Sequence, residues 1–297
     1  MAERLLTDVG TVIAQDPKIA DYDLLAGQSV TQIDGVRVFD IGQGDCSALL
    51  DGNGEPFLYV DYGGVIDHPD KPKYTNLHKR LPIDQDKTVV LTHWDWDHYN
   101  SGRHNPAAKT AQWLVPRQNI GPQALAFANK LTKAACWPES QGQTPVRFAV
   151  GAVFDIQVEK CAPRPTGANA VEDRNLTGLA VMVIRKDASG SDERFVLLPG
   201  DAPYDKIPSC SGGSPPGGDC VGMLAYHHGS HSHWTTATDQ AMPGYGTYAV
   251  RLVYSFGASN SYHHPDRSNY QTSGWDGHGV ETPSLRAGNF DYEDIPF

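Results

Sequence analysis

The sequence predicts a layered α/β protein, on the strength of three observations. About ten short apolar runs have the residue types of β-strands, and only a few segments have helical spacing. Polar residues able to bind cations follow the ends of several runs, where layered α/β proteins usually carry their chemistry. The strand-like runs are residues 36–41, 46–50, 56–62, 87–92, 112–116, 153–159, 179–185, 194–199, 222–228 and 251–257.

Helical patterns are few and short. The clearest covers residues 121–136, with Pro122 in its first turn, and a shorter amphipathic pattern lies around residues 4–14. We expect residues 1–34 to be an N-terminal extension packed on the main domain, and residues 35–297 to form that domain, because no linker divides the chain. The Gly- and Pro-rich stretch 209–219 predicts a surface loop that covers the cleft as a flap.

Composition limits the kind of protein. The chain has 297 residues and a formal net charge of −11, which disfavours a broad basic face for duplex nucleic acid but not a locally positive cleft that contains metal. No window approaches the roughly 18 apolar residues of a membrane span. The first residues include acidic side chains and no apolar core of a secretory signal, so we expect a cytoplasmic protein.

The cysteines do not indicate a structural framework. There are five, an odd number, and no CxxC pair occurs, so neither a disulfide network nor a thiolate zinc site is predicted. Cys210 and Cys220 bracket a loop and could pair under oxidising conditions.

The stretch VVLTHWDWDHYNSG, residues 89–102, is the most informative. His93, Asp95, Asp97 and His98 follow directly on an apolar run. Alternate residues of an extended loop point to one side, so the tryptophans between them point to the other. Carboxylates this close repel one another unless a cation lies among them. The alternative is a surface loop whose charges are merely solvated.

Later strand ends carry comparable residues. Asp201 follows one apolar run, His227 and His228 follow the next, and His263 and His264 follow a third. One histidine near a strand end is more often a structural residue than a ligand. Three successive strands that each end in Asp or His favour a metal site.

The motifs resemble those of a known family. FDIGQGDCSALL, LTHWDWDHYNSG, LLPGDA with AYHHGSHS, and YSFGASNSYHHP occur in that order over roughly residues 35–266. The chain resembles metallo-β-lactamase-fold hydrolases, and more closely the metallohydrolase domain of the ComEC family of bacterial DNA-uptake competence proteins. This resemblance implies an α/β fold of the metallo-β-lactamase type, a four-layer αβ/βα sandwich with metals at one edge between two sheets.

The resemblance also implies roles for individual residues. His93 and Asp95 would hold a first metal, Asp97 and His98 a second, and Asp201 would bridge them. The HHGS pair would supply a further ligand, with His227 slightly preferred to His228. The implied metal ligands are therefore His93, Asp95, Asp97, His98, Asp201, His227 and His228.

The residues implied in catalysis are Asp97, His264 and Asp45. His264 would lie near the reacting group as a proton donor or phosphate contact, and Asp45 would face the same edge. Asp61 matches an early aspartate that orients the site from behind the ligands. For Asp45 and Asp61, turn capping is an equal alternative.

Two departures from the family pattern bear on the metal. Asp95 stands where the wider superfamily often has histidine, and no histidine occurs between His104 and His227. Asp173 or Asn175 occupies the place of the missing middle histidine. Hard oxygen ligands favour Mn²⁺ or Mg²⁺ over Zn²⁺. We expect two divalent metal ions, Mn²⁺ or Zn²⁺, with Mg²⁺ as a further candidate.

The resulting functional hypothesis is a metal-dependent hydrolase. The resemblance implies a phosphodiesterase or nuclease that acts on DNA or nucleotides through water activated by two metals. The alternatives are hydrolysis of another bond, such as a lactone, thioester or β-lactam, and a non-catalytic module that contains metal. The expected partner is a nucleic acid or nucleotide substrate, with no membrane, and the oligomeric state is left open.

Overall fold

The computed structural model describes residues 6–14, 19–64, 81–166, 171–212, 217–246, 248–257, 263–282 and 292–297. The first large sheet has the strand order β16-β2-β3-β4-β5-β6-β8, and the second has the order β15-β14-β13-β12-β11-β10-β9. The first comprises β2 (Ile33–Phe39), β3 (Ser47–Asp51), β4 (Pro56–Val60), β5 (Thr88–Val90), β6 (Gln112–Val115), β8 (Lys133–Cys136) and β16 (Tyr292–Pro296). The second comprises β9 (Val146–Val150), β10 (Phe154–Lys160), β11 (Leu179–Lys186), β12 (Asp192–Leu198), β13 (Asp219–Leu224), β14 (Arg251–Tyr254) and β15 (Gly279–Glu281).

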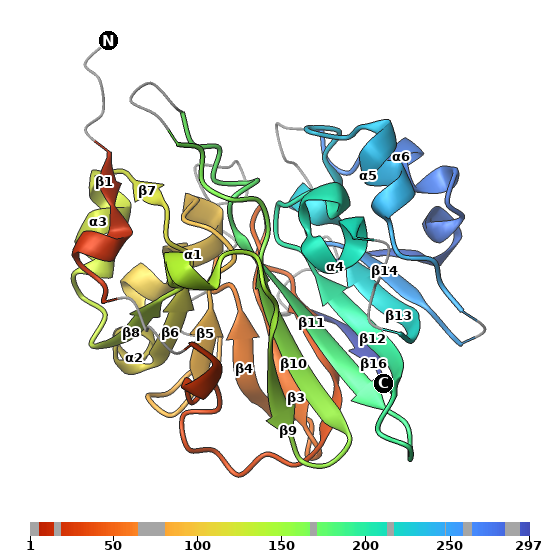
Figure 1. Cartoon of the computed structure of the whole chain (residues 1–297), viewed down its shortest axis with the longest axis horizontal. Coiled ribbons are helices and arrows are strands. Elements are labelled where there is room, and N and C mark those ends of the chain that lie inside the picture. The colour runs from red at the N-terminus through yellow and green to blue at the C-terminus, as the bar shows by residue number, and fades with distance from the viewer. Residues whose placement is uncertain are drawn as a thin grey trace.

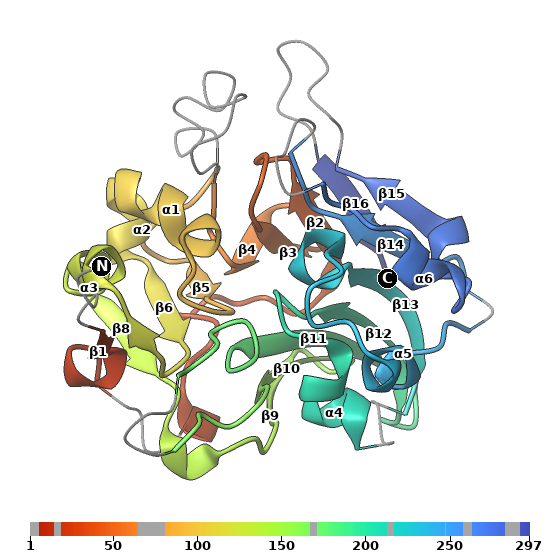
Figure 2. The same cartoon turned by 90° about the horizontal axis from the view of Figure 1, so that it is seen from above.

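The two sheets pack face to face, and helices cover their outer faces (Figure 1). The helices are α1 (Trp96–His104), α2 (Pro106–Thr110), α3 (Pro122–Ala128), α4 (Pro208–Ser211), α5 (Thr236–Ala241) and α6 (Ser268–Gln271). Figure 2 shows α1–α3 beside the first sheet and α4–α6 beside the second.

Three apolar clusters correspond to the three interfaces of this sandwich. The central cluster takes inward residues of both sheets, such as Val38 and Val181. A second cluster packs the outer face of the first sheet against α1–α3 through Trp113 and Phe127, and a third packs Leu197 and Trp275 outside the second sheet. Burial on both faces explains why most of these strands read as continuous apolar runs. The predicted four-layer αβ/βα sandwich is confirmed.

Strand polarity brings the ligand-bearing loops to one edge. β5 runs parallel to β4 and β6, and β13 runs parallel to β12 and β14. The carboxyl ends of parallel neighbours meet at the same edge of a sheet. The loops after β5, β12 and β13 therefore converge where the two sheets face each other.

All ten strand-like runs form strands, but both predicted helices differ from the structure. Only Pro122–Ala128 is helical in the segment 121–136, because Lys133–Cys136 pairs in parallel with β6 as strand β8. In the segment 4–14, the described residues 6–14 form the short strand β1 (Thr7–Asp8) and a 3₁₀ turn (Val9–Thr11). β1 pairs with β7 (Asn119–Ile120), and this tertiary pairing overrides the weak helical pattern.

The first sheet is completed by a strand far away in sequence. β16 pairs antiparallel with β2, and the Arg37 guanidinium donates two hydrogen bonds of 2.9 Å to the Asp294 carboxylate. Bidentate Arg–carboxylate pairs fix geometry as well as charge. The pairing therefore fixes the register of the edge strand.

Two further expectations concern the cysteines and the flap. All five cysteines lie in the described part of the chain and are free, buried thiols, so Cys210 and Cys220 are not paired. The predicted flap 209–219 is shorter than expected, because residues 209–211 belong to helix α4 and Asp219 begins β13, while residues 213–216 lie outside the described residues. No helix among the described residues is long and apolar enough to cross a membrane.

Candidate metal centre

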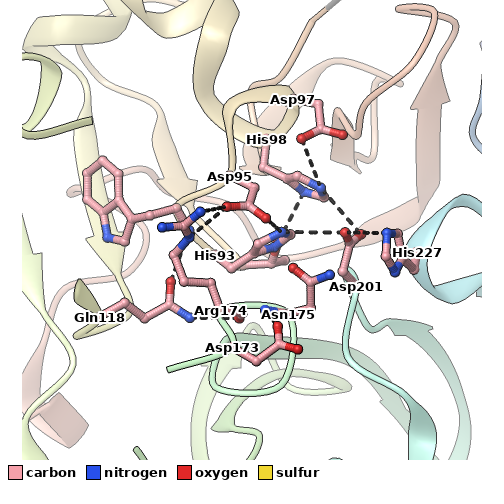
Figure 3. Close-up of polar contacts among 12 residues, drawn as sticks. His93, Asp95, Asp97, His98, Gln118, Asp173, Arg174, Asn175, Asp201 and His227 are labelled. Atoms are coloured by element: carbon pink, nitrogen blue, oxygen red, sulfur yellow. Dashed lines mark hydrogen bonds and ion pairs between the residues drawn. The ribbon is translucent and has the colours of Figure 1, made fainter. Parts of the chain in front are cut away.

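The loop between β5 and α1 presents alternate residues to opposite sides. The indole of Trp94 is buried in the outer apolar cluster and donates a hydrogen bond to the Pro116 carbonyl at 3.1 Å, and its backbone N–H donates to Gln118 Oε1 at 3.0 Å. Trp96 packs against the same cluster. This packing turns His93 and Asp95 toward the space between the sheets (Figure 3).

A close backbone approach sets the position of Asp201. It follows β12 and Gly200, whose φ is +57°. A Cβ at Gly200 would lie 2.6 Å from Thr92, the residue before His93, so only glycine allows the two loops to come this close. The carboxylate of Asp201 is thereby brought among the histidines.

The two histidines after β13 lie in strained backbone. His227 and His228 both have left-handed conformations, with φ of +48° and +57°. Such conformations cost free energy in non-glycine residues and are found mainly where function requires a particular side-chain direction. Here they let two successive rings face the same space.

Asp201 lies between two groups of ligand atoms. Its Oδ2 is 3.5 Å from His93 Nε2 and 3.5 Å from His227 Nε2. Asp95 Oδ2 is 3.6 Å from the same His93 nitrogen. We refer to the group His93, Asp95 and His227 as the first position.

The other oxygen of Asp201 faces a second group. Asp201 Oδ1 is 3.3 Å from His98 Nε2 and 3.8 Å from His228 Nε2, and His228 Nε2 is 3.3 Å from Asp97 Oδ2. Asp45 belongs to this group, with Oδ1 3.4 Å from His228 Nδ1. We refer to the group Asp45, Asp97, His98 and His228 as the second position. His227 and His228 thus divide between the two positions.

The second position has dimensions suited to a cation. One ligand atom from each of Asp45, His98, Asp201 and His228 lies within 4.8 Å of the others, and all four side chains are buried. Ligands about 2.0–2.6 Å from a shared cation lie roughly 3–5 Å apart.

Asp61 supports the ligands from behind. Its Oδ1 accepts a hydrogen bond from Thr92 N at 2.7 Å, and its Oδ2 accepts from Thr92 Oγ1 at 2.7 Å and from His98 Nδ1 at 2.8 Å. With Nδ1 as donor, the Nε2 of His98 is left with a lone pair directed at Asp201. His228 Nδ1 similarly donates to the Ser255 carbonyl at 2.8 Å.

The electrostatic field of the site attracts positive charge. Burial alone would lower the pKa of His98, but the Asp201 and Asp61 carboxylates raise it well above its ordinary value. Burial also lowers the pKa of His93, yet Asp201 is among the groups that raise it to about 9. Imidazoles in such surroundings either hold protons or face a cation.

Buried polar atoms without hydrogen-bond partners show whether the site suits a metal ion. Among the described residues, several buried atoms that face this space make no hydrogen bond of acceptable geometry. They are Asp45 Oδ1, His93 Nε2, His98 Nε2, Asp201 Oδ1 and His228 Nε2. Buried polar atoms are rarely left unpaired. These atoms are the imidazole and carboxylate donors that Zn²⁺ and Mn²⁺ accept, so the residues fit divalent cations.

The remaining predicted residues lie around this centre. The ring centroid of His264 is 5.8 Å from that of His227 and 6.2 Å from that of His228. Burial, followed by repulsion from those two rings, lowers the pKa of His264 to about 4. Its ring is therefore neutral at pH 7 in the metal-free protein. His263 is exposed.

Asp173 and Asn175 were the two candidates for the place where the resembling family has its middle histidine. Asp173 faces His233, whose Nε2 is 3.3 Å from Asp173 Oδ2. Figure 3 shows the Asn175 amide pointing toward His93 and Asp201. Of the two candidates, Asn175 therefore lies closer to the first position.

Two residues of this site were not predicted from the sequence. Arg174 contacts Asp95, and Gln118 binds the backbone of both Trp94 and Arg174. Neither belongs to a ligand motif, and the only signal was the run of charges in VEDRN beside the expected ligand. Their contacts depend on tertiary placement of a long loop.

No protein-family model matches the sequence, and no curated protein does. Several solved structures have a similar fold, including metallo-β-lactamase-fold proteins. YhfI from Bacillus subtilis is 14% identical, with a TM-score of 0.44 over 88% of this chain and 100% of that one. An isothiocyanate hydrolase from Delia radicum gut bacteria is 14% identical, with a TM-score of 0.44 over 86% of this chain and 99% of that one.

A mutant of the CmlA β-hydroxylase is also similar, at 14% identity and a TM-score of 0.45 over 88% of this chain. The chain spans about half the length of that protein, 54%. The similar structures thus include a hydroxylase and a hydrolase, and a fold shared at this level does not identify the reaction.

Proposed function

We propose that the protein is a metal-dependent hydrolase, and specifically a phosphodiesterase or nuclease that acts on DNA or nucleotides. One observation carries this proposal: the two oxygens of Asp201 face two separate groups of imidazole and carboxylate ligands. A shared carboxylate between two ligand groups is the arrangement of two-metal hydrolytic sites.

The two positions would hold one divalent cation each. His93, Asp95 and His227 would bind the first, Asp97, His98 and His228 would bind the second with Asp45 beside them, and Asp201 would serve both. When bound, two such cations supply Lewis-acid activation of water and neutralise the charge that develops on phosphoryl oxygens. No serine or cysteine nucleophile is then required.

The chain's own side chains would orient the reactants. The Asp97 side chain keeps 16% of its surface exposed, against 4% for Asp201, so it is accessible to a water molecule and would orient it by accepting a hydrogen bond. His264, neutral at pH 7, would hydrogen-bond a phosphoryl or leaving oxygen. Asp45, whose Oδ1 makes no hydrogen bond, would add a further carboxylate beside the second position.

The substrate class rests on chemistry and charge. Oxygen-rich ligand sets suit the metals used in phosphoryl transfer, and the sequence motifs resemble those of the ComEC metallohydrolase domain. The net charge of −11 favours single strands or small nucleotides over long duplexes, because duplex binding depends on neutralising many phosphates. A cytoplasmic location is part of this proposal.

A substrate panel tests the proposal. Metal-free protein reloaded with Mn²⁺ should hydrolyse bis(p-nitrophenyl) phosphate and single-stranded DNA, and Asp201→Asn reloaded in the same way should not. Turnover of a lactone, a thioester or a β-lactam, without phosphodiesterase activity, would replace the proposed substrate class. Metal binding with no turnover of any substrate would indicate a non-catalytic module.

A further inference from the structure

The loop between β10 and β11 brings the side chains of Arg174 and Asn175 to the first position (Figure 3). Gln118 Nε2 donates hydrogen bonds to the Arg174 carbonyl at 2.8 Å and to Thr177 Oγ1 at 3.0 Å. Its Oε1 accepts from the backbone of Trp94, the neighbour of His93, at 3.0 Å. Gln118 therefore ties this loop to the ligand loop after β5, as Figure 3 shows.

The guanidinium of Arg174 is committed to Asp95. Its Nε and Nη2 lie 2.6 and 2.5 Å from Asp95 Oδ1, and its Nη1 lies 3.5 Å from the Asn119 carbonyl. Both side chains are about 30% exposed, so solvent screens the pair only in part. Two of its nitrogens are therefore held by the Asp95 carboxylate, which places the positive charge of Arg174 directly beside it.

The two positions consequently carry very different charge. At the first position, Asp95 is offset by Arg174, and among the described residues the other carboxylate that faces it is the shared Asp201. At the second position, Asp45 and Asp97 join Asp201, and Asp61 lies directly behind His98. A divalent cation is attracted by carboxylates and repelled by a nearby guanidinium, most strongly where burial limits screening.

We propose that Arg174 makes the two metal positions unequal, so that a divalent cation fills the second position first and the first position only at higher concentration. The inference rests on the proposed metal-dependent function and adds the order of loading. The centre is then a resident cation at the second position and an exchangeable cation beside Asp95.

Titration of the metal-free protein with Mn²⁺ tests this order without an activity assay. Isothermal titration calorimetry gives the constants, electron paramagnetic resonance counts free Mn²⁺, and native mass spectrometry gives the stoichiometry. The unmodified protein should show two steps, the second weaker by roughly tenfold or more. Asp95→Asn should weaken only the second step, which assigns that step to the first position.

Variants of Arg174 separate charge from positioning. Arg174→Gln should tighten the second step by about tenfold while the first step stays unchanged. Arg174→Lys keeps the positive charge and should leave the second step weak. The matched control is Arg147→Gln, because that guanidinium binds Asp192 at 2.8 Å rather than Asp95, and it should change neither step.

Two results would overturn the inference. One is a pair of indistinguishable steps in the unmodified protein, and the other is a weaker second step in Arg174→Gln, which would mean that Arg174 only positions Asp95. Either result leaves the proposed hydrolase function standing. Absence of any Mn²⁺ binding would remove both the inference and the proposed function.

Discussion

His98 Nδ1 lies 2.8 Å from Asp61 Oδ2, and this hydrogen bond determines which ring nitrogen of His98 faces Asp201. Asp61 is almost completely buried, and its φ of +61° directs the carboxylate toward both Thr92 and His98. One side chain behind the ligands thus orients the ring of His98 and the backbone from which His93 projects.

Replacing this carboxylate should weaken metal binding. Asp61→Asn keeps the size of the side chain and tolerates the left-handed backbone, but it puts an N–H group where only acceptors fit. We expect affinity for Mn²⁺ at the second position to fall about 10- to 100-fold in titrations of the metal-free protein. Asp187→Asn, in an exposed turn, is the control. An unchanged constant would mean that other contacts orient His98.

Loss of the shared carboxylate should affect both positions. Asp201→Ala and Asp97→Ala should each abolish hydrolysis and lower the metal content measured by mass spectrometry, while circular dichroism shows a retained fold. Asp201→Ala should lose more metal, because its oxygens face both positions. Full metal content and activity in both variants would contradict these assignments.

The absence of a middle histidine should determine which metal ion gives the more active protein. We expect Mn²⁺ to restore more phosphodiesterase activity to the metal-free protein than Zn²⁺, because the carboxylates of Asp95 and Asp201 make up half of the ligands at the first position. Asn175→His should shift the balance toward Zn²⁺, since the Asn175 amide points toward His93 and Asp201. Asp173→His is the matched control, because Asp173 faces His233 instead. Higher activity with Zn²⁺ in the unmodified protein would contradict this prediction.

A buried lysine gives the stability a defined pH dependence. Burial lowers the pKa of Lys160 from 10.5 to about 8, and its ammonium donates to the carbonyls of Thr177 and Arg117. Between pH 8 and 10.5 the unfolded chain binds one proton more than the folded chain, so stability rises with pH in this window.

Urea unfolding of the protein and of Lys160→Met, at pH 7 and pH 10, tests this dependence. The free energy of unfolding of the unmodified protein, relative to the variant, should increase by up to about 3 kcal/mol across the window. A difference that is independent of pH would show that Lys160 has an ordinary pKa.

The apolar runs predicted a layered α/β protein because its strands are buried on both faces, and the four-layer sandwich was implied by the resemblance to metallo-β-lactamase-fold hydrolases. Long apolar runs such as residues 179–185 read as strands without ambiguity, and a ligand motif directly after a run locates its loop. The helices were less predictable. The segment 133–136 was expected to be helical and is a strand, because its pairing with β6 outweighs local propensity.

The candidate site was predictable where ligands follow strands, as with His93 and Asp201. The contact between Arg174 and Asp95 was not, because it depends on how residues 171–178 are tied down by Gln118. The assignment of His227 to the first position and His228 to the second could not be predicted from the sequence either. It arises from left-handed backbone at both residues, which sequence patterns do not reveal.

The edge strand β16 has a consequence for folding kinetics. Arg37 and Asp294, which join β2 to β16, are 257 positions apart in the chain. Contacts of such long sequence separation form slowly, because the intervening chain must first be ordered. Until β16 docks, the hydrogen-bonding edge of β2 is open to pairing with other chains. We therefore expect aggregation during refolding to depend on protein concentration and to be suppressed once this last strand is in place.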